Sequence, residues 1–207
     1  MEEEQFTIFD HEMKPIGVAA RSEVHKLGYW HETFQCWFVS REDDEHYIYL
    51  QIRSADKKDY PSLYDITAAG HLLSDETVKD GVREIKEEIG IDVKFDELKS
   101  LGIMKYAIEN NKIIDREFAH VFLYQSNRSF EDFTLQTEEV AGMLKAKLSD
   151  FSGLWRKNRA NIEIEGYELN ESGKKQFFRK IVSREHFMPH SEQYYMDVIE
   201  AIYRYLD

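Results

Sequence analysis

The chain has 207 residues, a net charge of −13 at pH 7, 42% hydrophobic residues and 14% aromatic residues. This composition excludes a disordered chain, and the length suits one elaborated domain rather than two independent ones. The negative charge argues against a nucleic acid polymer bound through its phosphates. A small anionic substrate would therefore need a metal ion or a local basic cluster.

Compartment signals favour the cytoplasm. Cys36 is the only cysteine, so an internal disulfide is excluded and a reducing setting is favoured. The N-terminal Met-Glu-Glu-Glu-Gln lacks the basic start and apolar core of a signal peptide. No apolar run approaches the roughly 18 residues that a membrane-spanning helix needs. We therefore expect a cytoplasmic protein with no membrane contact.

Strand-forming runs dominate the chain before and after one central helix. An N-terminal hairpin is expected within residues 1–29, and a buried strand at 34–39 carries Cys36 as a packed core thiol. The remaining predicted strands are 47–52, 65–69, 93–95, 98–106, 117–124 and 143–148.

The last quarter of the chain is predicted to be an extension. A short helix is expected at 148–155, a polar excursion at 161–174 that can form an inserted hairpin, and an amphipathic helix at 193–206. The whole pattern predicts an α+β fold, an α-β-α sandwich with a mixed central sheet covered by helices. We expect one domain over residues 1–207, with a core at about 30–150 and an extension at 151–207 that forms a lid or a homodimer contact.

Residues 70–91 carry the strongest chemical signal. Apolar residues recur there at spacings of four, three and four, which predicts a helix with one apolar stripe: Val78, Val82, Ile85 and Ile89. Glu84, Glu87 and Glu88 lie at i, i+3 and i+4, roughly 140° around the helix from that stripe. The helix is therefore expected to place three carboxylates on one solvent-facing edge.

Three crowded carboxylates repel one another, and a bound cation would remove that cost. Hard divalent ions such as Mg²⁺ take oxygen ligands of this kind beside a glycine turn. The alternative is a charged, solvated helix face without a ligand, since 40 of the residues are Asp or Glu.

Taken together, Gly70, an acid at Asp75 or Glu76, and Arg83-Glu84-x-x-Glu87-Glu88-x-Gly90-Ile91 resemble the signature box of Nudix hydrolases. The resemblance implies a Nudix-type fold with Mg²⁺ or Mn²⁺ held by Glu84, Glu87, Glu88 and a carbonyl near Gly70. Arg83 would orient a box glutamate. The box is one residue shorter than usual, so the early acid is Asp75 counted back from Arg83, or Glu76 counted forward from Gly70.

About residues 7–148 also resemble the type I isopentenyl-diphosphate isomerases through short blocks: Arg21-x-x-x-His25, Trp30-His31, Arg53-x-x-x-Lys57, Gly70-His71 and Asp115-x-Glu117. The resemblance implies a second metal site with five ligands, namely His25, His31, His71, Asp115 and Glu117. Such a set suits Mn²⁺, Fe²⁺ or Zn²⁺. It also implies that Arg21, Arg53 and Lys57 bind the substrate's diphosphate. The isomerases need a cysteine directly before the Gly-His pair, and this chain has Ala69.

The leading expectation is metal-dependent hydrolysis of a small diphosphate, either a nucleoside diphosphate linked to another moiety or a related organic diphosphate. Glu138 or Glu139, on a loop, is a candidate general base. Aromatic side chains at Trp30, Tyr60 and Tyr64 could stack on the organic half of the substrate. The alternatives are an isomerase-like enzyme acting on an isoprenoid diphosphate and a non-catalytic sensor of a phosphorylated metabolite.

Overall fold

The longest strand, β3 (Trp30–Glu42), has an apolar side chain pattern on both of its faces. Successive side chains of a strand point to opposite faces of the sheet. Phe34 and Cys36 belong to one buried cluster, and Trp37 and Val39 belong to the other. Because both faces are covered, the segment has a continuous hydrophobic run in place of an alternating one. Cys36 is fully buried, as predicted.

The structure is a computed structural model that describes residues 4–109 and 114–206, and the eleven strands within these ranges form one mixed sheet. The order along the sheet is β11-β10-β9-β4-β3-β1-β2, and β5, β6 and β8 pair with β4 or β3. The pairing of β3 with β8 is parallel, and the other pairings between these strands are antiparallel. The other strands of the first 150 residues are β1 (Gln5–Phe9), β2 (Pro15–Ala20), β4 (Glu45–Arg53), β5 (Tyr64–Asp65), β6 (Ala68–His71), β7 (Lys99–Glu109), β8 (Ile114–Gln125) and β9 (Val140–Lys147).

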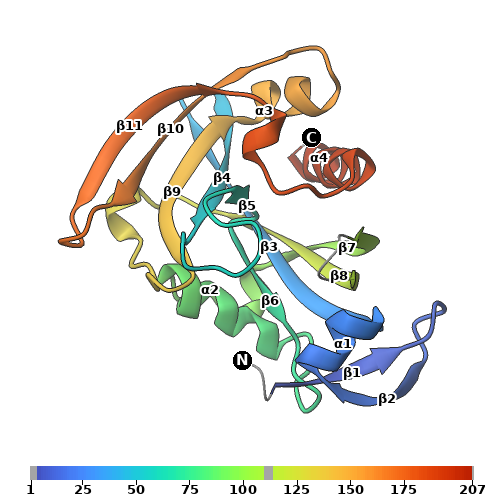
Figure 1. Ribbon diagram of the computed structural model, residues 1–207. Helices are drawn as coiled ribbons and strands as arrows, with labels where there is room; N and C mark the ends of the chain where they lie inside the picture. Colours follow the sequence, from blue (N-terminus) through green and yellow to red (C-terminus); the bar gives the residue numbers. More distant parts are fainter. Residues whose placement is uncertain (1–3, 110–113, 207) are drawn as a thin grey trace.

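Helices cover both faces of this sheet (Figure 1). α2 (Arg83–Ile89) packs on the face that carries Cys36. α3 (Leu148–Trp155) and α4 (Glu192–Leu206) pack on the face that carries Trp37. The predicted α-β-α sandwich with a mixed sheet is therefore confirmed.

A short helix that the sequence did not indicate, α1 (Arg21–Leu27), follows the N-terminal hairpin. Val24 is its only buried residue, so the helix lacks the apolar periodicity by which helices are recognised. Gly28, with φ of 69°, ends the helix in the left-handed conformation and directs the chain into β3.

The C-terminal extension adds a hairpin to the sheet beside β9. Its strands are β10 (Ile162–Leu169) and β11 (Lys175–Val182). The predicted excursion at 161–174 covers the first strand and the turn, so the insert is confirmed and its second strand was missed. β11 is rich in exposed and basic side chains, which gives it no apolar alternation to detect.

Two other predicted elements differ from the structure. The strand expected at 93–95 is wrong, because the chain there forms a loop that leads into a 3₁₀ turn, η2 (Phe95–Glu97). The helix expected from residue 78 begins later, as a 3₁₀ turn, η1 (Asp80–Val82), that continues into α2. In the part of the chain that is described, each helix is too short or too polar to cross a lipid bilayer.

Candidate functional site

The three glutamates of α2 lie in three different environments. Glu88 is only 4% exposed, and its Oε2 accepts hydrogen bonds from the backbone N–H of Ala69 at 2.9 Å and from Nε2 of Gln51 at 3.2 Å. The side chain of Glu84 is 13% exposed and that of Glu87 is 52% exposed. The expected solvent-facing edge is therefore wrong, because β4 and β6 cover more of the helix than its apolar stripe alone.

Arg83 joins two of these glutamates to an upstream acid. Its Nη1 donates to Glu84 at 2.5 Å and to Glu87 at 3.0 Å. Its Nε and Nη2 donate to the two carboxylate oxygens of Glu76 at 2.5 and 2.8 Å, a bidentate pair. Of the two candidates for the early acid, Glu76 is the one that joins Arg83.

The buried glutamates are poorly suited to carrying bare charges. Burial raises the pKa of Glu84 to about 7, with the charge of Glu87 adding to the effect and Arg83 opposing it. Burial likewise raises the pKa of Glu88 to about 8, opposed by the charge of Lys57 and reinforced by that of Glu84. A proton or a cation relieves this cost, and carboxylate oxygens are the donors that Mg²⁺ and Mn²⁺ prefer. The donor set therefore fits a hard divalent ion.

Gly70 allows the backbone of β6 to approach this acidic site. A Cβ atom at position 70 would overlap the carboxylate of Glu84. Only glycine permits this approach, which places the peptide groups of β6 beside the glutamates of α2.

The three basic residues expected to bind phosphate all form ion pairs within the protein. Arg53 donates to Asp65 Oδ2 at 2.8 Å and to the carbonyl oxygens of Asp59 and Tyr60 at 2.8 and 2.9 Å. It thereby orders the loop between β4 and β5. Arg21 pairs with Glu4 at 2.8 Å.

Lys57 forms an ion pair with Glu139. This pair lies near the acidic site, since the charge of Lys57 acts on the carboxyl of Glu88. Glu138, the other candidate for the general base, is exposed. The structure thus brings Glu139 towards the acidic site through Lys57.

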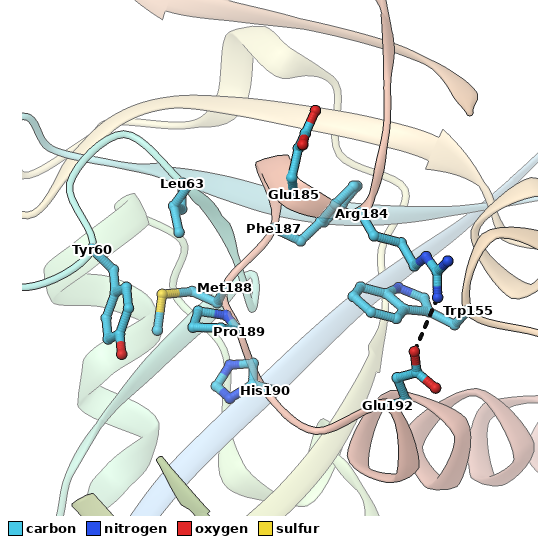
Figure 2. A pocket seen from close by; sticks show the side chains of 10 residues that line it. All are labelled: Tyr60, Leu63, Trp155, Arg184, Glu185, Phe187, Met188, Pro189, His190 and Glu192. Atoms are coloured by element: carbon cyan, nitrogen blue, oxygen red, sulfur yellow. Dashed lines mark hydrogen bonds and ion pairs between the residues drawn. The ribbon is translucent and has the colours of Figure 1, made fainter. Parts of the chain in front are cut away.

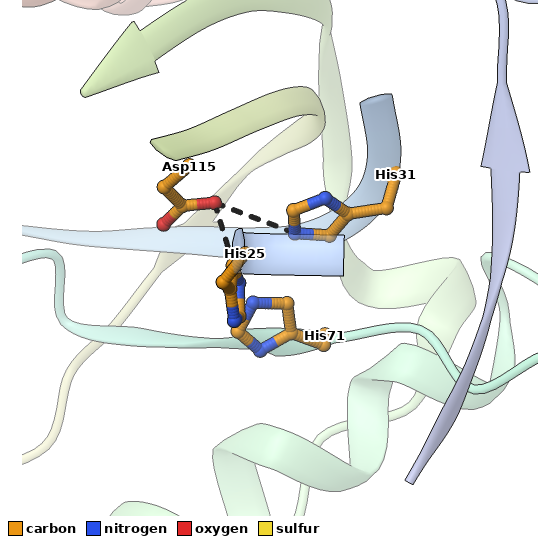
Figure 3. Close-up of side chains that lie close together, drawn as sticks. All are labelled: His25, His31, His71 and Asp115. Carbon is orange, nitrogen blue, oxygen red and sulfur yellow. Dashed lines mark ion pairs between the residues drawn. The ribbon is translucent and has the colours of Figure 1, made fainter. Parts of the chain in front are cut away.

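A second group of side chains converges at the other end of β6. Among the residues that the structure describes, His25, His31, His71 and Asp115 form the set of metal-binding side chains whose ligand atoms all lie within 4.8 Å of one another. Figure 3 shows the three imidazole rings and the carboxylate pointing towards one another. We call these four residues the histidine cluster. Two ligands at about 2.0–2.2 Å from one ion lie at most about 4.4 Å apart, so a small contraction would let the cluster hold a metal.

The protonation of the histidine cluster suits metal binding. Nδ1 of His31 lies 3.1 Å from the carbonyl oxygen of Tyr29 and donates to it, which leaves Nε2 with a free lone pair. Burial lowers the pKa of His31 and, together with the neighbouring positive charges, lowers that of His71 much further. Both imidazoles are therefore neutral at pH 7.

The inward-facing atoms of the histidine cluster lack hydrogen bonds and make only long ion-pair contacts with one another. The Nε2 atoms of the three histidines and Oδ1 of Asp115 are buried without hydrogen-bond partners among the described residues. Asp115 Oδ1 lies 3.5 Å from His25 Nε2 and 3.4 Å from His31 Nε2. Buried polar atoms are rarely left unpaired, so four that converge on one point fit a metal ion.

Glu117, the fifth residue of the expected metal site, lies outside this group of four. Its Oε2 accepts hydrogen bonds from Thr33 Oγ1 at 2.6 Å, Tyr106 Oη at 2.7 Å and Gln35 Nε2 at 3.2 Å. Burial, together with the charge of Asp115, raises the pKa of Glu117 well above its usual value. In this structure the residue anchors a buried polar network behind the histidine cluster.

Several residues that support these sites escaped the sequence analysis. Gln51 contacts Glu88, and Thr33, Gln35 and Tyr106 contact Glu117. Thr33, Gln35 and Gln51 are polar residues within largely buried strands, a signal that is conspicuous only once that burial is known, whereas Tyr106 lies on the mostly exposed β7 and carries no such signal.

A protein-family model matches most of the chain. Residues 22–161 match the model of the NUDIX domain. An uncharacterised Nudix hydrolase of Clostridium acetobutylicum is 40% identical over 202 residues, which cover 98% of each chain. An isopentenyl-diphosphate Delta-isomerase of Salmonella paratyphi B is 27% identical over 159 residues, which cover 75% of this chain and 82% of the isomerase.

Solved structures resemble the fold at low sequence identity. A crystal structure from Deinococcus radiodurans has a TM-score of 0.55 and 15% identity, covering 72% of this chain and 87% of the other. A MutT/nudix family protein from Enterococcus faecalis has a TM-score of 0.50 and 12% identity, covering 85% of this chain and 62% of the other.

Proposed function

We propose, from the premise that this chain belongs to the Nudix hydrolase family, that it cleaves the diphosphate linkage of a small organic diphosphate with the help of divalent metal. The favoured substrates are nucleoside diphosphates linked to another moiety. The observation that carries the proposal is the pair of buried glutamates, Glu84 and Glu88, whose raised pKa values are relieved by a cation.

Glu84, Glu87 and Glu88 would hold Mg²⁺ or Mn²⁺, with a backbone carbonyl near Gly70. An ion held there would supply positive charge to neutralise the diphosphate and would favour in-line attack by water. Arg83 acts as the positioning residue, because it bridges Glu76, Glu84 and Glu87 and so fixes where the carboxylates lie. Gln51 positions Glu88 by donating a hydrogen bond to its Oε2.

Lys57 and Glu139 lie on loops beside this site, whereas Arg53 ends β4 and Arg21 begins α1. Lys57 is released for substrate when its ion pair with Glu139 opens, and Glu139 is then free to accept a proton from water. Glu138 is the alternative base. Arg21 has its Glu4 partner on the N-terminal hairpin, and Arg53 holds the loop that carries Lys57.

The histidine cluster would hold a second metal ion, for which three imidazoles and one carboxylate suit Zn²⁺, Mn²⁺ or Fe²⁺. The proton transfer of the isomerases has no counterpart at position 69, because alanine carries no ionisable group. This argues for hydrolysis over isomerisation. We place the active protein in the cytoplasm, and the C-terminal extension, residues 151–207, remains our candidate for a homodimer contact.

The test is a substrate panel with Mg²⁺ and with Mn²⁺, comprising nucleotide sugars, dinucleotide cofactors, ADP-ribose, coenzyme A and prenyl diphosphates. The double variant Glu87→Gln/Glu88→Gln should lose at least about 100-fold in kcat, as when one essential charge-stabilising group is removed from an active site. Glu163→Gln, an exposed change on β10, is the matched control and should keep full activity. Tight ligand binding without turnover in any metal would favour the sensor instead.

A further inference from the structure

A pocket of about 570 Å³ opens between the loop that precedes β5 and the C-terminal extension. This volume lies within the usual range for small-molecule sites, about 300–1,000 Å³. Figure 2 shows Tyr60 and Met188 on one side of the pocket and Trp155, Arg184 and Glu192 on the other. The extension is fixed to the sheet here, because the N–H of Met188 donates to the carbonyl oxygen of Tyr64 at 2.8 Å.

The walls of the pocket are largely aromatic and apolar. Tyr60, Trp155, Phe187 and Met188 line it. The backbone at Tyr60 and at Ser62 is left-handed, with φ of 49° and 63°. Non-glycine residues rarely adopt this conformation, which occurs in tight turns and at functional sites. The loop turns at these two residues, and the Tyr60 side chain lines the pocket.

His190 contributes an unpaired acceptor to the pocket wall. Its Nε2 lies 3.3 Å from Oδ1 of Asp65. Burial opposes the charge of Asp65, but the hydrogen bond from His190 and the charge of Arg53 outweigh it and lower the pKa of Asp65 well below its usual value. An ionised carboxylate only accepts, so Nε2 carries a proton, and in the neutral imidazole Nδ1 is then an acceptor. Nδ1 is buried without a partner among the described residues, and an N–H donor entering the pocket would satisfy it.

Glu192 supplies a second, charged acceptor at the rim. Its carboxylate pairs with Lys157 at 2.7 Å and with Arg184 at 3.0 Å, and these contacts lower its pKa. A carboxylate so placed suits the vicinal hydroxyls of a ribose, the role that an acidic residue has in dinucleotide sites.

The pocket is connected to the acidic site through two strands. Asp65, which binds His190, is the register partner of Gln51 across β4 and β5. Gln51 in turn donates to Glu88. Paired strand residues lie about 5 Å apart, so the wall of the pocket and the hydrolytic glutamates share one short piece of sheet.

We propose that this pocket binds the ribonucleoside half of the substrate, with the base against the Tyr60 ring and His190 and the ribose hydroxyls on Glu192. The proposal rests on the proposed hydrolysis for its biological use, but the binding itself needs no catalytic metal. A prenyl chain would fill the apolar walls and leave both acceptors unsatisfied.

The experiment measures binding of AMP, dAMP and geranyl monophosphate to the full chain in EDTA by calorimetry. AMP should bind tighter than dAMP by about five- to tenfold, the size of one hydrogen bond to a charged group at a partly exposed site. Glu192→Ala should abolish this difference, and the ratio of the two affinities cancels any effect of freeing Arg184 and Lys157. Tyr60→Ala should weaken both nucleotides at least about fivefold. Phe177→Ala, which removes a 61% exposed ring on β11, is the control and should change nothing.

Tighter binding of geranyl monophosphate than of AMP would overturn the proposal. So would an AMP to dAMP ratio that Glu192→Ala leaves intact, or AMP binding that Tyr60→Ala does not weaken. The two proposals fail separately. If the protein shows metal-dependent turnover but no Glu192-dependent preference for AMP over dAMP, only the pocket assignment is wrong. If it shows that preference but turns over no substrate, only the hydrolase proposal is wrong.

Discussion

Replacing Glu88 by glutamine should stabilise the metal-free protein at alkaline pH. Glutamine keeps the shape of the side chain and a carbonyl oxygen for the N–H of Ala69, but it carries no charge. In the folded protein the pKa of Glu88 is about 8, against a usual value of 4.5. The folded state therefore retains a proton between these pH values that the unfolded state has released.

The sign of the effect follows from this difference in bound protons. When folding raises the pKa of a carboxyl group, the free energy of unfolding of the protein falls as pH rises from the unfolded-state pKa to the folded-state pKa. The fall is complete above the folded-state pKa. Each pH unit costs about 1.4 kcal/mol, so the passage from pH 6 to pH 8 removes roughly 2–3 kcal/mol. Glu88→Gln has no ionisable group at position 88, so its free energy of unfolding should not show this fall.

The assay is urea denaturation in EDTA at pH 6 and pH 9, for the wild type, Glu88→Gln and the half-exposed control Glu87→Gln. The free energy of unfolding of the wild type should fall between the two pH values by about 2–3 kcal/mol more than that of Glu88→Gln. Addition of Mn²⁺ at pH 9 should raise the free energy of unfolding of the wild type and have a smaller effect on that of Glu88→Gln. Equal pH dependence in the wild type and Glu88→Gln would refute the assignment of Glu88 as a buried, cation-seeking carboxyl.

Three further changes test other contacts. Gly70→Ala should lower kcat at least about tenfold, because its Cβ displaces the Glu84 carboxylate; normal kcat with an unchanged fold by circular dichroism would contradict the close approach of β6. Arg53→Ala leaves the buried Asp65 with only His190 and the N–H of Ile66 as partners and should cost about 3–5 kcal/mol in urea denaturation, and a loss below about 1 kcal/mol would show that the ion pair is not structural. His71→Ala should remove one equivalent of bound transition metal per chain by elemental analysis of protein dialysed against Zn²⁺, whereas unchanged stoichiometry would exclude the histidine cluster as a metal site.

The strands around the core were predictable because burial leaves a direct trace in the sequence. The runs at 34–39 and 47–52 are apolar on both faces and are found in β3 and β4. α1 was missed because a seven-residue helix with one buried side chain has no periodicity to display. β11 was missed because its side chains are mostly exposed.

The sites were predictable only in part, because residue spacing identifies donors but not their surroundings. The spacing of Glu84, Glu87 and Glu88 correctly placed all three on one short helix. It could not show that Gln51 and Ala69 enclose Glu88, since those contacts come from strands distant in the sequence. The role of Arg53 in ordering its own loop rests on carbonyl oxygens only six and seven residues later, but residue spacing does not show that the loop turns back onto the guanidinium.

The parallel pairing of β3 with β8 makes the histidine cluster sensitive to strand alignment. His31 is the register partner of Glu117 on β8, and Asp115 lies two residues earlier on the same strand. A slip of one residue would turn Asp115 to the opposite side of the sheet and separate it from the imidazoles. A metal ion bound by these side chains would therefore stabilise the observed register of β3 and β8 relative to a register shifted by one residue. Metal binding would thus also select the correct strand pairing.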